Sequence, residues 1–362
     1  MRTCLGTTTL IVLSPVALLA ALSAMPGEPE EKKPSPRVLA GLPDASPSAA
    51  APARVNHAGR QLPSMPPLKT PLLFNTPEAD AILAALQVFP LDNPWNEDIS
   101  KRPVHPDSDK MIKFVGAEKR IGYNLDMGFV LVPPDQPKIA VKLTAYADES
   151  DRGPYPMPDN APIEGWPLEG GTLEKIQREG RGDRHSLVVD PFNRMLYEFY
   201  QARRTDAGWQ AACEATFDLK TNKLRPRGWT SSDAAGLPIF PSVPRYDECE
   251  RGMVEHALRF TVRHTRREFI YPATHQAGSG KDPSVPAMGQ RFRLKASVDV
   301  SAFPKHAKAI ALALQKYGMF VADNGHDWLI SVAPDARLKG LDALRKLKGS
   351  DFEVIVTTGE HK

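Results

Sequence analysis

The sequence has 362 residues, of which 41% are hydrophobic and 25% charged, which is enough for a sizeable buried core. The formal net charge is only +3 and no block of Lys or Arg stands out, so the composition argues against nucleic acid as a partner. The 35 prolines indicate long irregular connections rather than a helical bundle.

The first 24 residues have the pattern of a secretory signal peptide. Arg2 supplies positive charge, Leu10 to Leu22 form an apolar run, and Ala21 to Ala24 offer small residues for cleavage. A membrane anchor is the alternative, but the run is shorter than the roughly 20 residues of a spanning helix. We therefore expect a secreted, periplasmic or cell-envelope protein with no stable membrane insertion after cleavage.

Residues 25–70 are rich in Pro, Ala and Ser without a sustained apolar period, which predicts a disordered tether or, alternatively, a propeptide. A single globular domain is predicted over residues 71–362. Beyond the signal peptide only Cys213 and Cys249 remain, and such a pair in an oxidising compartment favours one disulfide. A zinc site that recruits His256, or two free thiols, are the alternatives.

The folded part begins with a predicted helix. Thr76 is a good N-cap, Pro77 occupies the first helical position, and apolar residues from Ala79 to Leu86 recur at helical spacing. Strands are expected next over residues 128–132 and 138–147, because the second of these alternates between apolar and polar side chains.

Residues Gly182 to Tyr200 read GDRHSLVVDPFNRMLYEFY and predict a β-hairpin with titratable groups at its open end. If a turn of two or four residues follows Asp190, His185 faces Tyr200 and Glu198 lies diagonally on the same face. A turn of odd length would remove this pairing. A His beside a carboxylate can act as a general base near neutral pH, and a structural His bonded to a neighbouring loop is the alternative.

The rest of the chain predicts more strands and a C-terminal α/β portion. Strands are expected over residues 209–217, 257–264, 269–271 and 291–300, the first of which would complete an antiparallel meander with the hairpin. A helix over 304–317, a hairpin from 319–322 and 328–332, a helix from Leu338 to Leu347 and a strand over 352–357 follow. The predicted fold is mostly β, an antiparallel β-sandwich or jelly-roll-like core with an α/β portion (residues 300–362) packed on it.

Seven short phrases of the sequence are distinctive: residues Tyr146–Asp151, Gly182–His185, Trp229–Leu237, Arg245–Glu248, His256–Phe260, Arg293–Ser297 and Ala322–Gly325. Together they resemble a family of secreted bacterial proteins of uncharacterised function. The phrases lie between about residues 90 and 358. The resemblance implies a secreted bacterial protein and brings no activity and no catalytic residue.

The catalytic candidates are titratable residues in or near the hairpin and in later loops: His185, Glu198, Asp183, Glu248 and Asp233. Glycosidases use two carboxyl groups about 5–5.5 Å apart for retention or about 6.5–9.5 Å apart for inversion. Glu248 could form such a pair with Glu198 or Asp183, and an extended conformation of residues 247–250 would place Glu248 on one face with Glu250. Solvated surface acids are the alternative. The ExDxxE, RxExR and QIH motifs of jelly-roll glucanases and alginate lyases do not occur.

No cofactor and no metal are assigned. The sequence lacks a Walker loop, a GxSxG elbow and HExxH or CxxC spacing. The acids of Asp148–Arg152 could bind calcium, but they lack the DxDxDG spacing, so a solvated loop is favoured. His256, His264 and His275 could join His185 as copper or zinc ligands, which is the less favoured interpretation.

The tryptophans point to carbohydrate. Trp95, Trp166, Trp209 and Trp229 each follow a Pro or Gly, and rings exposed in loops can stack on sugar faces, whereas plugs at the ends of the core are the alternative. The predicted substrate-binding residues are Arg184, Trp229, Trp95, Trp166 and Tyr200. We therefore predict a secreted carbohydrate-active protein that cleaves polysaccharide by His/carboxylate acid–base chemistry. The alternatives are a non-catalytic glycan- or cell-wall-binding protein and a structural envelope protein without a ligand.

Overall fold

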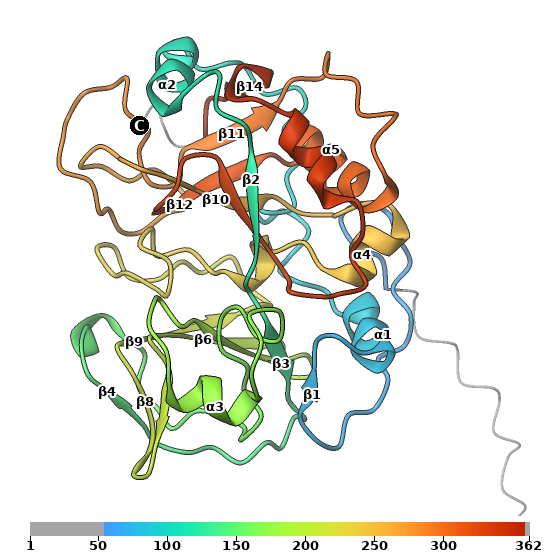
Figure 1. The fold of residues 1–362 in the computed structure, drawn as a ribbon, viewed down its shortest axis with the longest axis vertical. Coiled ribbons are helices and arrows are strands. Elements are labelled where there is room, and N and C mark those ends of the chain that lie inside the picture. The colour runs from blue at the N-terminus through green and yellow to red at the C-terminus, as the bar shows by residue number, and fades with distance from the viewer. Residues whose placement is uncertain (1–53, 359–362) are drawn as a thin grey trace, which may run out of the picture. The chain divides into compact units, whose positions relative to one another are not determined.

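The computed structural model describes residues 54–358 (Figure 1). The predicted signal peptide and residues 25–53 of the predicted tether lie outside this part of the chain. The remaining tether residues make specific contacts, because Asn56 Nδ2 donates to Glu255 Oε2 at 2.8 Å and Leu62 is buried. The folded part of the chain therefore includes residues before Pro71.

The predicted hairpin forms the centre of a five-stranded sheet. The sheet has the order β1 (Leu72–Leu73), β3 (Phe129–Leu131), β5 (Ser186–Asp190), β6 (Met195–Tyr200) and β9 (Cys213–Asp218). Leu187 pairs with Glu198 and Asp190 with Met195, so the turn has an even number of residues. Of the two turn lengths considered, this is the one that places His185 opposite Tyr200. The Asp190 carboxylate closes this turn by accepting hydrogen bonds from the backbone N–H groups of Phe192 and Asn193.

Both faces of this sheet are buried. On one face Leu187, Val189 and Leu196 join the main hydrophobic core. On the other face Val188, Tyr197 and Phe199 join a second core, as the alternation of the sequence predicts. The second core also contains residues of a three-stranded sheet with the order β4 (Val141–Leu143), β8 (Gly208–Ala211) and β7 (Arg203–Thr205).

The strand predicted over residues 209–217 is interrupted. At Ala212 the chain leaves β8 in the three-stranded sheet and enters β9, which pairs antiparallel with β6. The meander β5–β6–β9 is confirmed. The turn at Asp206–Gly208 closes the β7–β8 hairpin, because Thr205 pairs with Gly208.

A mixed six-stranded sheet holds the C-terminal half of the chain. Its order is β14 (Phe352–Val354), β11 (Arg291–Leu294), β12 (Met319–Asn324), β10 (Leu258–Val262), β13 (Leu329–Val332) and β2 (Gly122–Leu125). The predicted hairpin of β12 with β13 is wrong, because β10 lies between them, parallel to β12 and antiparallel to β13. The α/β portion thus belongs to this sheet, and Figure 1 shows α5 (Lys305–Lys316) beside β11.

The helices agree with the sequence where capping and apolar spacing coincide. α1 (Pro77–Ala85) begins after Thr76, whose side chain accepts from Ala79 N, and α5 lies within its predicted range. The predicted leucine helix is a short 3₁₀ segment, η3 (Leu341–Lys346). The other helices are α2 (Ser108–Val115), α3 (Leu173–Arg178), α4 (Tyr246–Arg251) and the 3₁₀ turns η1 (Ala147–Glu149), η2 (Phe240–Ser242) and η4 (Gly349–Asp351).

The structure is rich in sheet, but both larger sheets are mixed, since β3 is parallel to β5 and β13 is parallel to β2. A β-sandwich or jelly roll is not confirmed and stays a prediction. Among residues 54–358, no helix is both long and apolar enough to span a membrane.

The predicted disulfide is not formed. Cys213 on β9 and Cys249 on α4 are both free and buried. The Cys213 thiol lies 3.6 Å from Ser150 Oγ, while Cys249 belongs to the main core. The two side chains therefore pack in separate surroundings.

Candidate functional site

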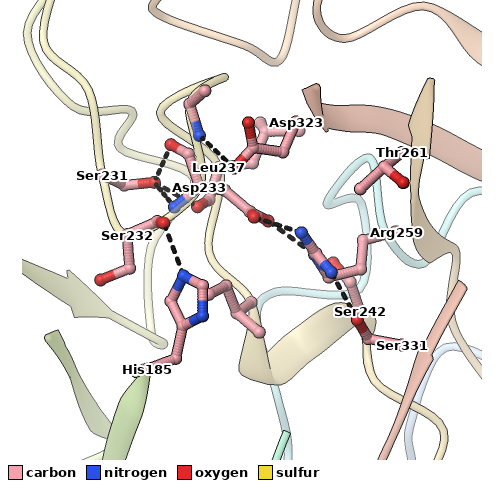
Figure 2. Close-up of polar contacts among 12 residues, drawn as sticks. His185, Ser231, Ser232, Asp233, Leu237, Ser242, Arg259, Thr261, Asp323 and Ser331 are labelled. Carbon is pink, nitrogen blue, oxygen red and sulfur yellow. Dashed lines mark hydrogen bonds and ion pairs between the residues drawn. The ribbon is translucent and has the colours of Figure 1, made fainter. Parts of the chain in front are cut away.

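His185 lies in a buried polar cluster that connects the two larger sheets (Figure 2). Its Nδ1 lies 3.0 Å from Glu164 Oε2 and its Nε2 lies 2.9 Å from the carbonyl oxygen of Ser232. Burial opposes the charged imidazole, but Glu164, Asp233 and the Ser232 carbonyl outweigh it and raise the pKa of His185 to about 9. At neutral pH both ring nitrogens are thus protonated and hydrogen-bonded. This is the structural role that the sequence left as the alternative, and it leaves no free nitrogen for a general base.

Asp233 is engaged in the same cluster. It is fully buried and receives two hydrogen bonds from the Arg259 guanidinium on β10, one from Nε at 2.8 Å and one from Nη2. Arg259 Nη1 donates to Ser331 Oγ on β13 (Figure 2). Asp233 therefore neutralises a buried cation and joins its loop to the six-stranded sheet.

Two acids of the cluster were not foreseen from the sequence. Glu164 is the ion-pair partner of His185, which holds the pKa of Glu164 below its ordinary value although burial opposes this. Asp126 lies where the chain passes from β2 to β3, and burial together with Glu164 raises the pKa of Asp126 to about 7. Neither acid stands in a recognisable motif, so only the tertiary contacts reveal them.

Glu198 is fully buried against a backbone turn. Its carboxylate accepts hydrogen bonds from Ile239 N at 2.9 Å and Phe240 N at 2.8 Å, at the start of η2. Burial raises the pKa of Glu198 to about 8. The side chain shares a strand face with Leu187, as predicted, but its carboxylate oxygens accept hydrogen bonds from backbone N–H groups at the start of η2.

Glu248 belongs to another buried cluster. Residues 247–250 form part of α4, so the extended conformation considered for them is wrong. Glu248 pairs with Arg245 and lies 3.2 Å from His256 Nε2. Burial opposes ionisation, yet Arg245 and His256 lower the pKa of Glu248 to about 2. Among the described residues, no hydrogen bond or ion pair joins Glu248 to His185, Glu198 or Asp183, and the predicted carboxylate pair stays a prediction.

A pocket of about 310 Å³, lined mostly by polar residues, adjoins the His185 cluster at Ser232. The residues that line it are Tyr146, Asp183, Tyr200, Cys213, Thr230, Ser231, Ser232, Ala234, His275, Ala277, Asp323 and Asn324. Ser232 belongs to both the pocket wall and the cluster, since its carbonyl accepts from His185. The cluster thus fixes the pocket wall, and we call this cavity the Asp183–Asp323 pocket.

Tyr200 lines this pocket together with Asp183 and Asp323. Its hydroxyl lies 3.4 Å from Asp183 Oδ1, and the ring lies 5.6 Å from the His185 ring, as the predicted register requires. Burial first, then Asp183 and to a smaller extent Asp323, raise the pKa of Tyr200 to about 12. Asp183 and Asp323, which are far apart in the sequence, therefore share the lining of one pocket.

Asp323 is the acid of the pocket that the sequence did not single out. It is the last residue but one of β12 and is half-buried, with Oδ2 3.4 Å from Ala234 N and Oδ1 2.6 Å from Asn324 N. Burial and the negative charge of Asp233 raise the pKa of Asp323 to about 6. The phrase Ala322–Gly325 marked this position, but it was interpreted as a hairpin turn.

The predicted substrate-binding residues divide into packing and pocket positions. Arg184 is buried and its guanidinium donates to backbone carbonyls, including Ile176 O at 2.7 Å, which closes the end of α3. Trp95 is 2% exposed and its indole donates to Ser242 Oγ at 2.6 Å, so it belongs to the core. Trp166 is half-buried against the main core. Tyr200 and Trp229 line hollows at the surface.

The described residues contain no group of three or more His, Cys, Asp or Glu side chains that could hold a metal ion. Of the four histidines considered as metal ligands, His185 and His256 pair with different glutamates, and His275 Nδ1 lies 2.7 Å from Ala234 O. Comparisons of the chain with models of protein families, with curated proteins and with solved structures find no match.

Proposed function

We propose that this protein is a secreted or envelope-associated carbohydrate-active enzyme that cleaves a polysaccharide by acid–base chemistry in the Asp183–Asp323 pocket. The observation that carries the proposal is that two carboxylates in different surroundings, exposed Asp183 and half-buried Asp323, line one pocket together with Tyr200. When two carboxyl groups lie in surroundings that give them different proton affinities, one can act as the acid and the other as the base.

In this proposal Asp323 is the general acid and exposed Asp183 is the general base. With a pKa of about 6, Asp323 keeps its proton closer to neutral pH than an ordinary aspartate does. It would protonate the glycosidic oxygen as the bond to the anomeric carbon breaks, while Asp183 takes a proton from the attacking water. His185 and Glu198 are replaced in these roles because both are buried and engaged.

The lining of the pocket suits a polyhydroxylated substrate. Tyrosine, serine and threonine side chains lie on its wall together with His275 and Asn324, and these groups can both donate and accept hydrogen bonds. A volume of about 310 Å³ is at the lower end of the range of small-molecule sites, which runs from about 300 to 1,000 Å³.

The test is an assay of the full chain on a panel of neutral and acidic polysaccharides, with new reducing ends as the readout. We expect Asp323→Asn and Asp183→Asn each to lower kcat/KM by about 100- to 10,000-fold, while Tm stays near that of the wild type. Exposed Asp135 lies on a distant loop, so Asp135→Asn should leave activity unchanged. Because the acid must be protonated, kcat/KM should fall as pH rises through about 6. Activity that survives both pocket variants would refute the assignment.

A non-catalytic glycan-binding protein is the alternative, and Trp229 favours it. The indole is half-buried, lines a hollow of about 420 Å³ and lies 5.6 Å from the Arg225 guanidinium. Binding of insoluble glycan without product, lost in Trp229→Ala and kept in Asp323→Asn, would support this alternative over catalysis.

A further inference from the structure

The loop of residues 223–229 forms the common wall of two surface hollows. One hollow of about 630 Å³ reaches Phe269 and Tyr271, and the other, of about 420 Å³, reaches Trp229. Leu224 and Arg225 line both, so the hollows adjoin one another. We call the two together the 223–229 groove.

Aromatic and apolar surface is exposed along this groove. Leu224 is 37% and Tyr271 36% exposed, while Trp229 and Phe269 are half-buried. The Arg227 guanidinium lies over the Phe269 ring at 4.5 Å from its centroid. Large apolar side chains exposed in a hollow indicate a binding surface, and aromatic faces can stack on the C–H faces of sugar rings.

Each acidic side chain that lines the groove lies near a cation, whereas two of the cations of the groove have no paired carboxylate among the described residues. Asp151 is paired with Arg225, and Glu268 with Arg266. Asp218 lies 3.5 Å from Lys220 Nζ. Lys223 and Arg227 are exposed, and no described carboxylate pairs with either. Because a stacked guanidinium keeps its N–H edge available, Arg227 can receive a carboxylate beside a stacked ring.

We propose that the 223–229 groove binds an acidic polysaccharide, with sugar rings on Trp229 and Tyr271 and uronate carboxylates on Arg227 and Lys223. This inference rests on the proposed carbohydrate function and names its substrate class. Pro226 and Trp229 line the groove, and the next residues, Thr230 to Ser232, line the Asp183–Asp323 pocket. The linings of the groove and of the pocket are therefore continuous along the chain at this point.

Single-stranded nucleic acid is the other polyanion that combines stacking with charge. Such binding usually uses a strongly basic groove that follows the backbone of the strand. Here the groove offers two unpaired cations and also presents Asp151, Asp218 and Glu268 on its walls. This modest, mixed charge favours a sugar chain over a strand with a phosphate at every residue.

The test measures equilibrium binding of the full chain to polygalacturonate, with neutral dextran of similar length and a thymidine oligonucleotide for comparison. We expect polygalacturonate to bind best and its affinity to fall with added salt. Arg227→Gln should weaken it about 10-fold or more, the range of a lost charged hydrogen bond. Trp229→Ala should weaken it too. Lys223→Gln should weaken it as well, and its control is Lys113→Gln, which removes another exposed cation, on α2.

The outcomes separate this inference from the proposed function. Binding that depends on Arg227 without cleavage of any polymer would support the groove and refute the enzyme. Cleavage of a neutral polysaccharide without binding of polygalacturonate would support the enzyme and refute the groove. Tighter binding of the oligonucleotide, or equal losses in Lys223→Gln and Lys113→Gln, would overturn the groove assignment.

Discussion

Replacing His185 with Gln tests whether this residue holds the fold together rather than catalysing a reaction. Glutamine is similar in length but cannot carry the charge that faces Glu164 across 3.0 Å. The His185 pKa rises from an ordinary 6.5 to about 9 in the folded protein. Because one unit of pKa corresponds to about 1.4 kcal/mol, protonated His185 stabilises the fold by about 3 kcal/mol.

The sign of the pH dependence follows from the raised pKa. A group that binds its proton more tightly in the folded state contributes its full stability below the unfolded pKa of 6.5. That contribution is lost as pH rises through about 9, where His185 becomes neutral in the folded protein as well. The difference in unfolding free energy between wild type and His185→Gln should therefore be largest near pH 6 and about 3 kcal/mol smaller near pH 9.5.

Urea unfolding followed by tryptophan fluorescence measures this difference. Other titrating groups largely cancel because both proteins carry them, and Glu164→Gln should show the same pH dependence through loss of the same ion pair. His264→Gln is a suitable control, since His264 is exposed and its replacement should change little at any pH. A constant difference across this pH range, or wild-type stability of His185→Gln, would refute the structural role.

Two further predictions concern buried side chains. Asp233→Asn should destabilise the protein by about 3–5 kcal/mol in urea unfolding, because Arg259 would remain buried without its counter-charge. A change in stability no larger than that of exposed Asp135→Asn would contradict this prediction. Reduction with dithiothreitol should leave Tm unchanged, and a thiol reagent should modify Cys213 and Cys249 only after unfolding, because both are free and buried. A fall in Tm on reduction would reveal a disulfide.

The sequence by itself determined the local elements. The period-2 alternation between Ser186 and Tyr200 sufficed to predict the hairpin, because strand pairing across a short turn depends on neighbouring residues. The length of the turn after Asp190, which fixes the register, stayed open until the structure showed it. The helices α1 and α5 were predictable for the same reason, since caps and apolar spacing are local signals.

Only the tertiary structure decided which strands are neighbours and which acids meet. β10 separates β12 from β13. No local sequence pattern can show that a strand from more than fifty residues upstream lies between the two strands of a predicted hairpin. The same limit applies to the site. His185 finds Glu164 and Glu198 finds the amide of Ile239 at sequence separations of 21 and 41 residues.

Those distant partners changed the roles of the titratable residues. A histidine or glutamate in the sequence is an equally good candidate for catalysis or structure, and burial with satisfied hydrogen bonds assigns it to structure. Asp183 and Asp323, which are far apart in the sequence, line one pocket because the loop carrying Ser232 and Asp233 ties the five-stranded sheet to the six-stranded one. The sequence supplied the reactive groups, and long-range packing selected which of them reach a pocket.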